Sequence, residues 1–194
     1  MQRKIILASK SERRKMLLAQ IGLEFEIRES AYEEDMSALN DPHELAKFLA
    51  LGKAQDVANH YDDAIIIGAD TFVFYKGKFI GKPKNKEDAK KILTNFSGNT
   101  HDIVTGLAII DTKTKTVVTD YGEARVTFRK LTTEEIDDYI ATGEPMDKAG
   151  AYGLMHRAAV LIEKVEGDFY SVIGLPLNKL HVALKKMGVD TLRK

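Results

Sequence analysis

The pattern of hydrophobic and polar positions changes its period along the chain. The segment 3–8, with its apolar run IILA at 5–8, and the apolar run at 64–69 predict buried strands. The run at 64–69, AIIIGA, is apolar on both faces, which is typical of a central strand. Between them, apolar positions with helical spacing cover 42–60, where Asp41 can cap the helix and Pro42 occupies its first position. The first third of the chain is therefore expected to alternate strands with helices.

Turn and capping residues predict the remaining elements. Lys76-Gly77 separates two strand-like runs and 111–115 separates two longer ones, so both segments predict hairpins. Further helices are predicted over 9–21, 85–96, 132–142 and 176–187, and strands over 23–28, 71–75, 78–80, 101–110, 116–128 and 158–165. We therefore expect an α/β fold with a mixed, twisted sheet and flanking helices, in which residues 1–194 form a single domain with two lobes around a central cleft.

Composition excludes several classes of protein. A chain of 194 residues can bury a core without covalent cross-links, and the absence of cysteine excludes disulfides, thiolate metal sites and cysteine nucleophiles. No apolar run approaches the roughly 20 residues of a membrane span, and the N-terminus lacks the apolar stretch of a signal peptide. We therefore expect a cytoplasmic protein without a membrane partner.

Charge is balanced overall but segregated along the chain. Lys and Arg number 29, as do Asp and Glu, and a net charge of zero argues against a nucleic-acid partner. Residues 1–15 and 76–91 are nevertheless basic, and 24–35 are acidic. These segments are either solvated faces or the cationic walls and acidic loop of a cleft that binds an anion with a divalent metal.

Two segments place polar side chains next to the predicted buried strands. Ser9, Arg13 and Arg14 follow the first strand at a helix N-terminus, where free N–H groups attract anions; a helix with a capping Ser9 and a solvated basic face is equally compatible. Asp70 follows the most apolar strand. A buried carboxylate at that place needs a charged partner or a metal, which favours a functional role over a turn cap.

Two further sets of charged residues could complete such a site. Lys53 lies on a predicted helix and Lys82 lies between a glycine and a proline; both suit phosphate binding, although a single lysine is more often only solvated. Glu33-Glu34-Asp35 could join Asp70 in binding Mg²⁺ or Mn²⁺, or could be solvated. The five histidines lack metal-ligand spacing and no serine lies in a nucleophile-elbow pattern, which disfavours zinc and Ser-His-Asp catalysis.

Six segments carry a resemblance to a known protein family. In chain order they are ILASKSERR (6–14), IGADT (67–71), GKP (81–83), SGNTH (97–101), EPMDKAGAYG (144–153) and VIGLPL (172–177). From about residue 4 to residue 186, the chain closely resembles the Maf family of nucleoside triphosphate pyrophosphatases, also called septum formation inhibitor proteins.

The resemblance implies a fold, a reaction and a set of site residues. The implied fold is related to that of inosine triphosphate pyrophosphatases, and the implied reaction is the metal-assisted hydrolysis of a nucleoside triphosphate to the monophosphate and pyrophosphate. The resemblance points to a homodimer, but the sequence shows no interface and leaves the oligomeric state open. The implied site residues are Asp70 as the catalytic carboxylate, Ser9, Arg13 and Arg14 as the phosphate-binding turn, and Glu34, Lys53 and Lys82 as further polar residues of the cleft.

The motifs GADT and DKAGAYG resemble the dTTP/UTP branch of the family and not its 7-methyl-GTP branch. Arg13 and Thr71 match two of the three specificity positions of that branch. The third carries Met155 where the branch has glutamine, and methionine cannot make the paired hydrogen bonds of an amide to a base edge. The base preference is therefore left open. Glu12, which replaces the usual proline of the family, is expected to have little effect.

The residues and the resemblance lead to one hypothesis and two alternatives. In the hypothesis, Asp70, with Glu34 and a Mg²⁺ or Mn²⁺ ion, promotes attack of water on the α-phosphorus; Asp70 is the general base, a metal ligand or both. The first alternative is a non-enzymatic nucleotide-binding regulator of cell division. The second is a nucleic-acid-binding module that uses the basic segments 1–15 and 76–91, against which the zero net charge argues.

Overall fold

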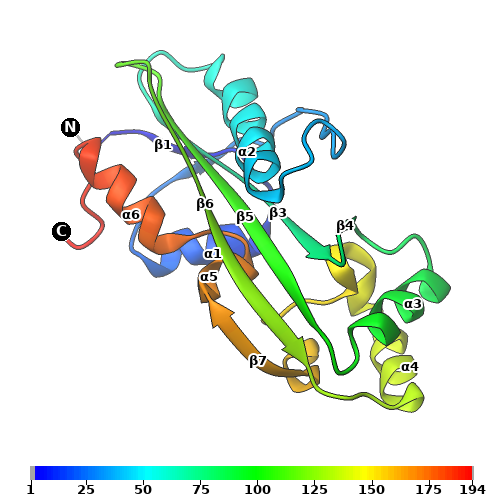
Figure 1. Ribbon diagram of the computed structural model, residues 1–194. Coiled ribbons are helices and arrows are strands. Elements are labelled where there is room, and N and C mark those ends of the chain that lie inside the picture. Colours follow the sequence, from blue (N-terminus) through cyan, green and yellow to red (C-terminus); the bar gives the residue numbers. More distant parts are fainter. Residues whose placement is uncertain (1–2, 194) are drawn as a thin grey trace. The chain divides into compact units, whose positions relative to one another are not determined.

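The computed structural model describes residues 3–193 (Figure 1). Its strands are β1 (Ile5–Leu7), β2 (Glu26–Ile27), β3 (Ile65–Tyr75), β4 (Lys78–Ile80), β5 (Thr100–Asp111), β6 (Thr116–Phe128) and β7 (Ile162–Gly167). Its α-helices are α1 (Glu12–Gln20), α2 (Pro42–Ala58), α3 (Lys86–Phe96), α4 (Thr133–Ala141), α5 (Phe169–Ile173) and α6 (Leu177–Lys186). Short 3₁₀ segments cover Glu144–Asp147 (η1), Ala149–Ala151 (η2) and Arg157–Leu161 (η3).

The strands form one mixed sheet in the order β2-β1-β3-β5-β6-β7, and β4 pairs with the end of β3. β1 is parallel to β2 and to β3, so Ile6 lies opposite both Glu26 and Ile66. β4 and β7 are antiparallel to their neighbours β3 and β6. The predicted α/β class is confirmed, and the AIIIGA run lies on β3 between β1 and β5, as its apolar character on both faces predicts.

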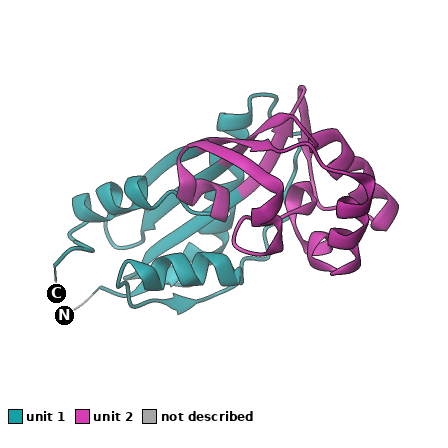
Figure 2. Ribbon diagram, turned by 90° about the horizontal axis from the view of Figure 1, so that it is seen from below, with its two compact units in different colours: residues 1–70, 105–122, 174–194 teal, residues 71–104, 123–173 magenta. Residues whose placement is uncertain are grey.

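The chain divides into two compact units (Figure 2). Unit 1 comprises Met1–Asp70, Thr105–Gly122 and Gly174–Lys194, and unit 2 comprises Thr71–Val104 and Glu123–Ile173. Strands β3, β5 and β6 each contribute residues to both units. The predicted central cleft stays a prediction, and each unit is described by itself.

Unit 1 packs α2 against β1, β3 and β5. The core residues between them are Ile6, Ala8, Ala50, Ala54, Val57, Ala64, Ile66, Ala108 and Ile110. Two strand glycines let the helix approach closely, because a Cβ at Gly68 or at Gly106 would collide with the carbonyl oxygens of Ala50 and Ala46, respectively. The backbone of α2 therefore lies directly on the sheet along this line.

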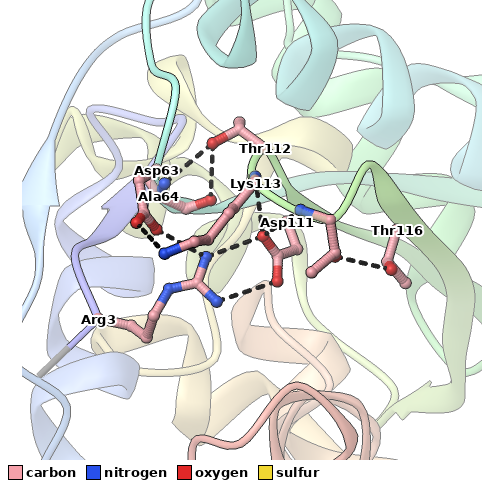
Figure 3. Close-up of polar contacts among 8 residues, drawn as sticks. Arg3, Asp63, Ala64, Asp111, Thr112, Lys113 and Thr116 are labelled. Atoms are coloured by element: carbon pink, nitrogen blue, oxygen red, sulfur yellow. Dashed lines mark hydrogen bonds and ion pairs between the residues drawn. The ribbon is translucent and has the colours of Figure 1, made fainter.

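A polar cluster joins the start of the described chain to the turn between β5 and β6 (Figure 3). The Arg3 guanidinium donates two hydrogen bonds to the Asp111 carboxylate, at 3.0 and 2.8 Å, and its Nη2 also lies 3.1 Å from Oδ1 of Asp63. Lys113 Nζ reaches the other oxygen of Asp63 at 2.7 Å. The hydrogen bonds from Arg3 hold the pKa of Asp111 well below its usual range, so this carboxylate stays charged.

Unit 2 has an aromatic core. Phe96, Phe128 and Tyr152 pack edge to face or tilted around His101, whose ring stacks on Phe96 with 4.0 Å between the ring centroids. His101 is 2 % exposed, and its Nε2 makes a 2.7 Å hydrogen bond with the Tyr152 hydroxyl. The buried face of α4, which includes Ile136, packs in the same core.

Several element boundaries differ from those expected. Residues 158–161 belong to the 3₁₀ segment η3 and not to a strand, so β7 begins only at Ile162. The segments 64–69 and 71–75 belong to one continuous strand, and α5 is an additional short helix. No described helix is both long enough and apolar enough to cross a membrane.

Candidate active site

The parallel pairing of β1 with β3 brings the carboxyl ends of both strands to one edge of the sheet. The Ala8 amide donates to the Ile67 carbonyl at 2.8 Å, so Ser9 follows β1 near the point where β3 continues to Asp70. Helix α1 begins three residues after Ser9. Its free N–H groups therefore lie close to the edge that carries Asp70, and they can donate hydrogen bonds to an anion there.

Ser9 has a different role from the helix cap expected for it. Ser11 is the N-cap residue of α1, and its side chain makes no capping hydrogen bond. The Ser9 hydroxyl oxygen instead accepts hydrogen bonds from the Ser11 amide at 3.2 Å and from Nη1 of Arg14 at 3.1 Å. Ser9 and Glu12 have the spacing of a capping box, but α1 begins only at Glu12, too late for Ser9 to cap it.

Arg14 is a buried cation, 9 % exposed. Its Nε donates to the Gly174 carbonyl at 2.9 Å, while Nη1 holds Ser9. Burial lowers the pKa of Arg14, the negative charges of Asp70 and Glu34 oppose this shift, and the positive charge of Arg13 adds to it. Arg13, Asp70 and Glu34 therefore each lie within electrostatic range of the Arg14 guanidinium.

Asp70 and Glu34 share one lysine. Asp70 is 5 % exposed, and its Oδ1 lies 2.5 Å from Nζ of Lys53. The same Nζ lies 2.6 Å from Oε1 of Glu34, whose side chain is 45 % exposed. Because a buried carboxylate is costly without a counter-charge, Lys53 explains how Asp70 is tolerated at the end of an apolar strand.

The contact between Lys53 and Asp70 follows from the packing of α2. Side chains alternate along β3, so Ile66, Gly68 and Asp70 share the face that α2 covers. The absent side chain at Gly68 brings the turn of α2 that contains Lys53 down to the strand. Thr71, as the next residue, points to the opposite face of β3.

The structure therefore brings together six of the predicted site residues, all in unit 1: Ser9, Arg13, Arg14, Glu34, Lys53 and Asp70. Thr71, Lys82 and Met155 belong to unit 2, and their place in the site stays a prediction. Lys82 is exposed between β4 and α3, and Met155 is 43 % exposed in the turn before η3.

Within unit 2, the segments that carry Lys82 and Met155 are linked. The Gly150 amide donates to the Gly81 carbonyl at 3.0 Å. Gly150 has a φ of 71°, and a Cβ there would lie 2.7 Å from Cγ2 of Val73, so this backbone position requires glycine. The two segments are thus fixed to one another through their backbones.

The carboxylates of the site are the type of ligand that a hard divalent cation prefers. Asp70 and Glu34 supply carboxylate oxygens, which Mg²⁺ and Mn²⁺ prefer, and Mg²⁺ commonly takes one or two carboxylates and completes its shell with water and phosphate oxygens. Within residues 3–193, no group of three or more His, Cys, Asp or Glu side chains could hold a metal ion by itself.

Sequence reasoning missed several residues that support the site. The Gly174 carbonyl orients Arg14. Asp56 of α2 accepts a hydrogen bond from the acidic loop that carries Glu34, and Tyr32 of that loop lies against Gly52 of α2. For these supporting contacts, the only signal in the sequence is Gly52. A glycine inside a strong helix costs stability and often marks a close approach of another group. The partner of Gly52 could not be identified without the fold.

Comparison with known proteins gives consistent matches over nearly the whole chain. A family model described as Maf-like protein matches residues 4–187. A protein of Alkaliphilus metalliredigens named dTTP/UTP pyrophosphatase is 50 % identical over 184 residues, which are 94 % of this chain and 95 % of the relative. A Bacillus anthracis protein of the same name is 48 % identical over 188 residues, 97 % of each chain.

Solved structures with a similar fold have little sequence identity to this chain. The Ham1 protein of Staphylococcus aureus matches with a TM-score of 0.52 and 12 % identity, over 95 % of this chain and 99 % of that one. A HAM1 protein from Coxiella burnetii matches with a TM-score of 0.51 and 12 % identity, over 95 % and 100 % of the two chains. These likenesses concern the fold alone.

Proposed function

The chain belongs to the Maf-like protein family, and from this membership we propose that it hydrolyses dTTP or UTP to the nucleoside monophosphate and pyrophosphate. The observation that carries the proposal is the buried Asp70 carboxylate, paired with Lys53 and within electrostatic range of Arg14 beside the N-terminus of α1. This arrangement combines a base with cationic groups suited to a phosphate chain.

In the proposed mechanism, the N-terminus of α1 and the arginines Arg13 and Arg14 bind the triphosphate. Asp70 accepts a proton from a water molecule whose oxygen attacks the α-phosphorus. The bond between the α-phosphorus and the bridging oxygen then breaks, and its electron pair leaves with pyrophosphate. Positive charge from the arginines and Lys53 stabilises the negative charge that develops on the phosphoryl oxygens.

Asp70 and Glu34 would hold a Mg²⁺ or Mn²⁺ ion that is also bound to the phosphates. Such an ion would supply positive charge to the phosphate oxygens and make a bound water more acidic. Lys53 lies against both carboxylates and supplies a positive counter-charge to them. In this proposal Asp70 serves both as proton acceptor and as cation ligand, the two roles that the residues alone left open.

Release of pyrophosphate by purified protein tests the proposal. With Mg²⁺ present, dTTP, UTP, CTP, ATP and 7-methyl-GTP are compared, and we expect the pyrimidine substrates dTTP and UTP to be hydrolysed fastest. Asp70→Asn removes the proton acceptor but keeps the shape of the side chain, so pyrophosphate release should fall about 10²- to 10⁴-fold.

The matched control is Asp62→Asn, which changes an exposed carboxylate outside the site and should leave the rate unchanged. Circular dichroism checks that both variants are folded. A rate for Asp70→Asn within tenfold of wild type would refute the role of Asp70. Tight nucleotide binding by the wild-type protein without pyrophosphate release would instead support the binding-only regulator.

A further inference from the structure

The acidic loop between β2 and α2 carries Glu34 and is fastened to α2 by a short chain of hydrogen bonds. Oδ2 of Asp56, on the last turns of α2, accepts a hydrogen bond from the Ser30 hydroxyl at 2.9 Å and another from the Ala31 amide at 2.8 Å. The Ser30 oxygen in turn accepts from the Tyr32 amide at 3.0 Å. One carboxylate thus fixes three consecutive residues of the loop. These contacts hold the pKa of Asp56 below its usual range.

The Tyr32 ring occupies the space that a side chain at position 52 would need. A Cβ added to Gly52 would lie 2.6 Å from Cε2 of Tyr32 and 2.7 Å from its Cε1. The ring therefore lies directly on the backbone of α2, one helical turn before Asp56. This close packing explains a glycine in the interior of a 17-residue helix, where alanine would otherwise be favoured.

The contact between Tyr32 and Gly52 is close in sequence to the charged residues Glu34 and Lys53. Gly52 precedes Lys53, and Tyr32 is two residues before Glu34. The ion pair between Glu34 and Lys53 involves a half-exposed carboxylate, and such pairs are too weak to order a loop by themselves. The hydrogen bonds to Asp56 and the packing of Tyr32 on Gly52 hold the loop two to four residues before Glu34.

We propose that Tyr32, Gly52 and Asp56 form a latch that holds the acidic loop on α2 and so positions Glu34 against Lys53 and Asp70. The three are positioning residues, because none of them is placed at the reacting atoms. Their effect on catalysis rests on the proposed function, whereas the ordering of the loop does not. The two parts of the inference can therefore be tested separately.

The main test variant is Gly52→Ala, which puts a methyl group where the Tyr32 ring lies. We expect the amides of 31–34 to lose hydrogen-exchange protection, and kcat/KM for dTTP to fall about tenfold, since small displacements of positioned groups are costly in catalysis. Asp56→Ala removes the acceptor for Ser30 and Ala31 and should have the same two effects. It tests the latch independently if Gly52→Ala does not fold.

Rescue and control variants separate positioning from general damage to the helix. Tyr32→Leu in the Gly52→Ala background makes room for the methyl group and should recover part of the lost kcat/KM. Tyr32→Phe keeps the ring and should behave as wild type. Gln55→Ala alters an exposed residue of α2 and should change neither readout.

Three outcomes would overturn the latch. Unchanged protection of 31–34 in both Gly52→Ala and Asp56→Ala shows that these residues do not hold the loop. Lost protection with kcat/KM within twofold of wild type shows that holding the loop does not position Glu34. Equal loss of activity in Gln55→Ala shows a general effect on α2. If the wild-type protein releases no pyrophosphate, the proposed function fails, and the exchange measurement still decides whether the latch exists.

Discussion

A buried side chain can carry a functional charge or be held neutral, and this protein contains both cases. Asp70 has a lysine at 2.5 Å and lies beside cationic groups, which makes it a candidate for chemistry. His101 is similarly buried, but its surroundings are aromatic, and its Nδ1 has no hydrogen-bond partner within residues 3–193. Burial lowers the pKa of His101 to about 3. The contrast indicates a structural role for His101.

This pKa predicts a specific dependence of stability on pH. An unfolded histidine titrates near 6.5, so between pH 6.5 and about 3 the unfolded state binds more protons than the folded state. The contribution of His101 is therefore fully present above pH 6.5 and is lost as the pH falls, by up to about 1.4 kcal/mol per pH unit. Urea unfolding at pH 7, 6, 5 and 4 measures this slope.

The matched variant is His101→Phe, which keeps an aromatic ring against Phe96 and removes the titratable group. We expect its free energy of unfolding to fall less steeply with decreasing pH than that of the wild type, although the Tyr152 hydroxyl loses its partner. Equal slopes for the two proteins would mean that His101 is protonated in the folded state and that its surroundings are less apolar than the structure indicates.

At the scale of helices and strands, local signals located most elements correctly. Asp41 accepts hydrogen bonds from the amides of His43 and Glu44, and Thr132 with Glu135 forms a complete capping box. Such caps depend only on residues a few positions apart, so the sequence is sufficient to find them. The hairpin at Lys76-Gly77 was correct for the same reason.

The wrong elements depend on contacts that the local sequence does not contain. Residues 158–161 have the apolar character of a strand, yet Ala158 and Leu161 are buried by a 3₁₀ turn, and a short apolar run cannot distinguish the two. The ion pairs of Lys53 likewise need the register of α2 on β3. Sequence alone could identify Asp70 and Lys53 as candidates but could not pair them.

The register of α2 on the sheet makes Gly106 a sensitive position. A Cβ there would collide with the carbonyl group of Ala46, so Gly106→Ala must push the helix away from β5. Overpacking of this kind costs about 1–3 kcal/mol. Urea unfolding should show this loss of stability. The control is Gly81→Ala, where a Cβ meets no atom of the described part of the chain within 4 Å and stability should be unchanged. A Gly106→Ala variant as stable as wild type would show that α2 does not lie this close to the strand.

At the scale of the whole molecule, the two compact units share three strands, β3, β5 and β6. The chain passes from one unit to the other inside β3, β5 and β6, and again between Ile173 and Gly174 after α5. If one unit unfolded alone, these strands would be broken along their length, and buried backbone groups would lose their hydrogen bonds. We therefore expect the two units to unfold together.

Two conservative core substitutions test this cooperativity. Ile66→Val in the core of unit 1 and Ile136→Val in the core of unit 2 should each lower the free energy of unfolding by about 0.5–1.5 kcal/mol. If unfolding is cooperative, each substitution reduces the protection of the slowest-exchanging amides in both units by the same amount, because these amides exchange through global unfolding. A loss of protection confined to the substituted unit would mean that the shared strands can separate, and that the residues of unit 1 around Asp70 keep their arrangement when unit 2 unfolds.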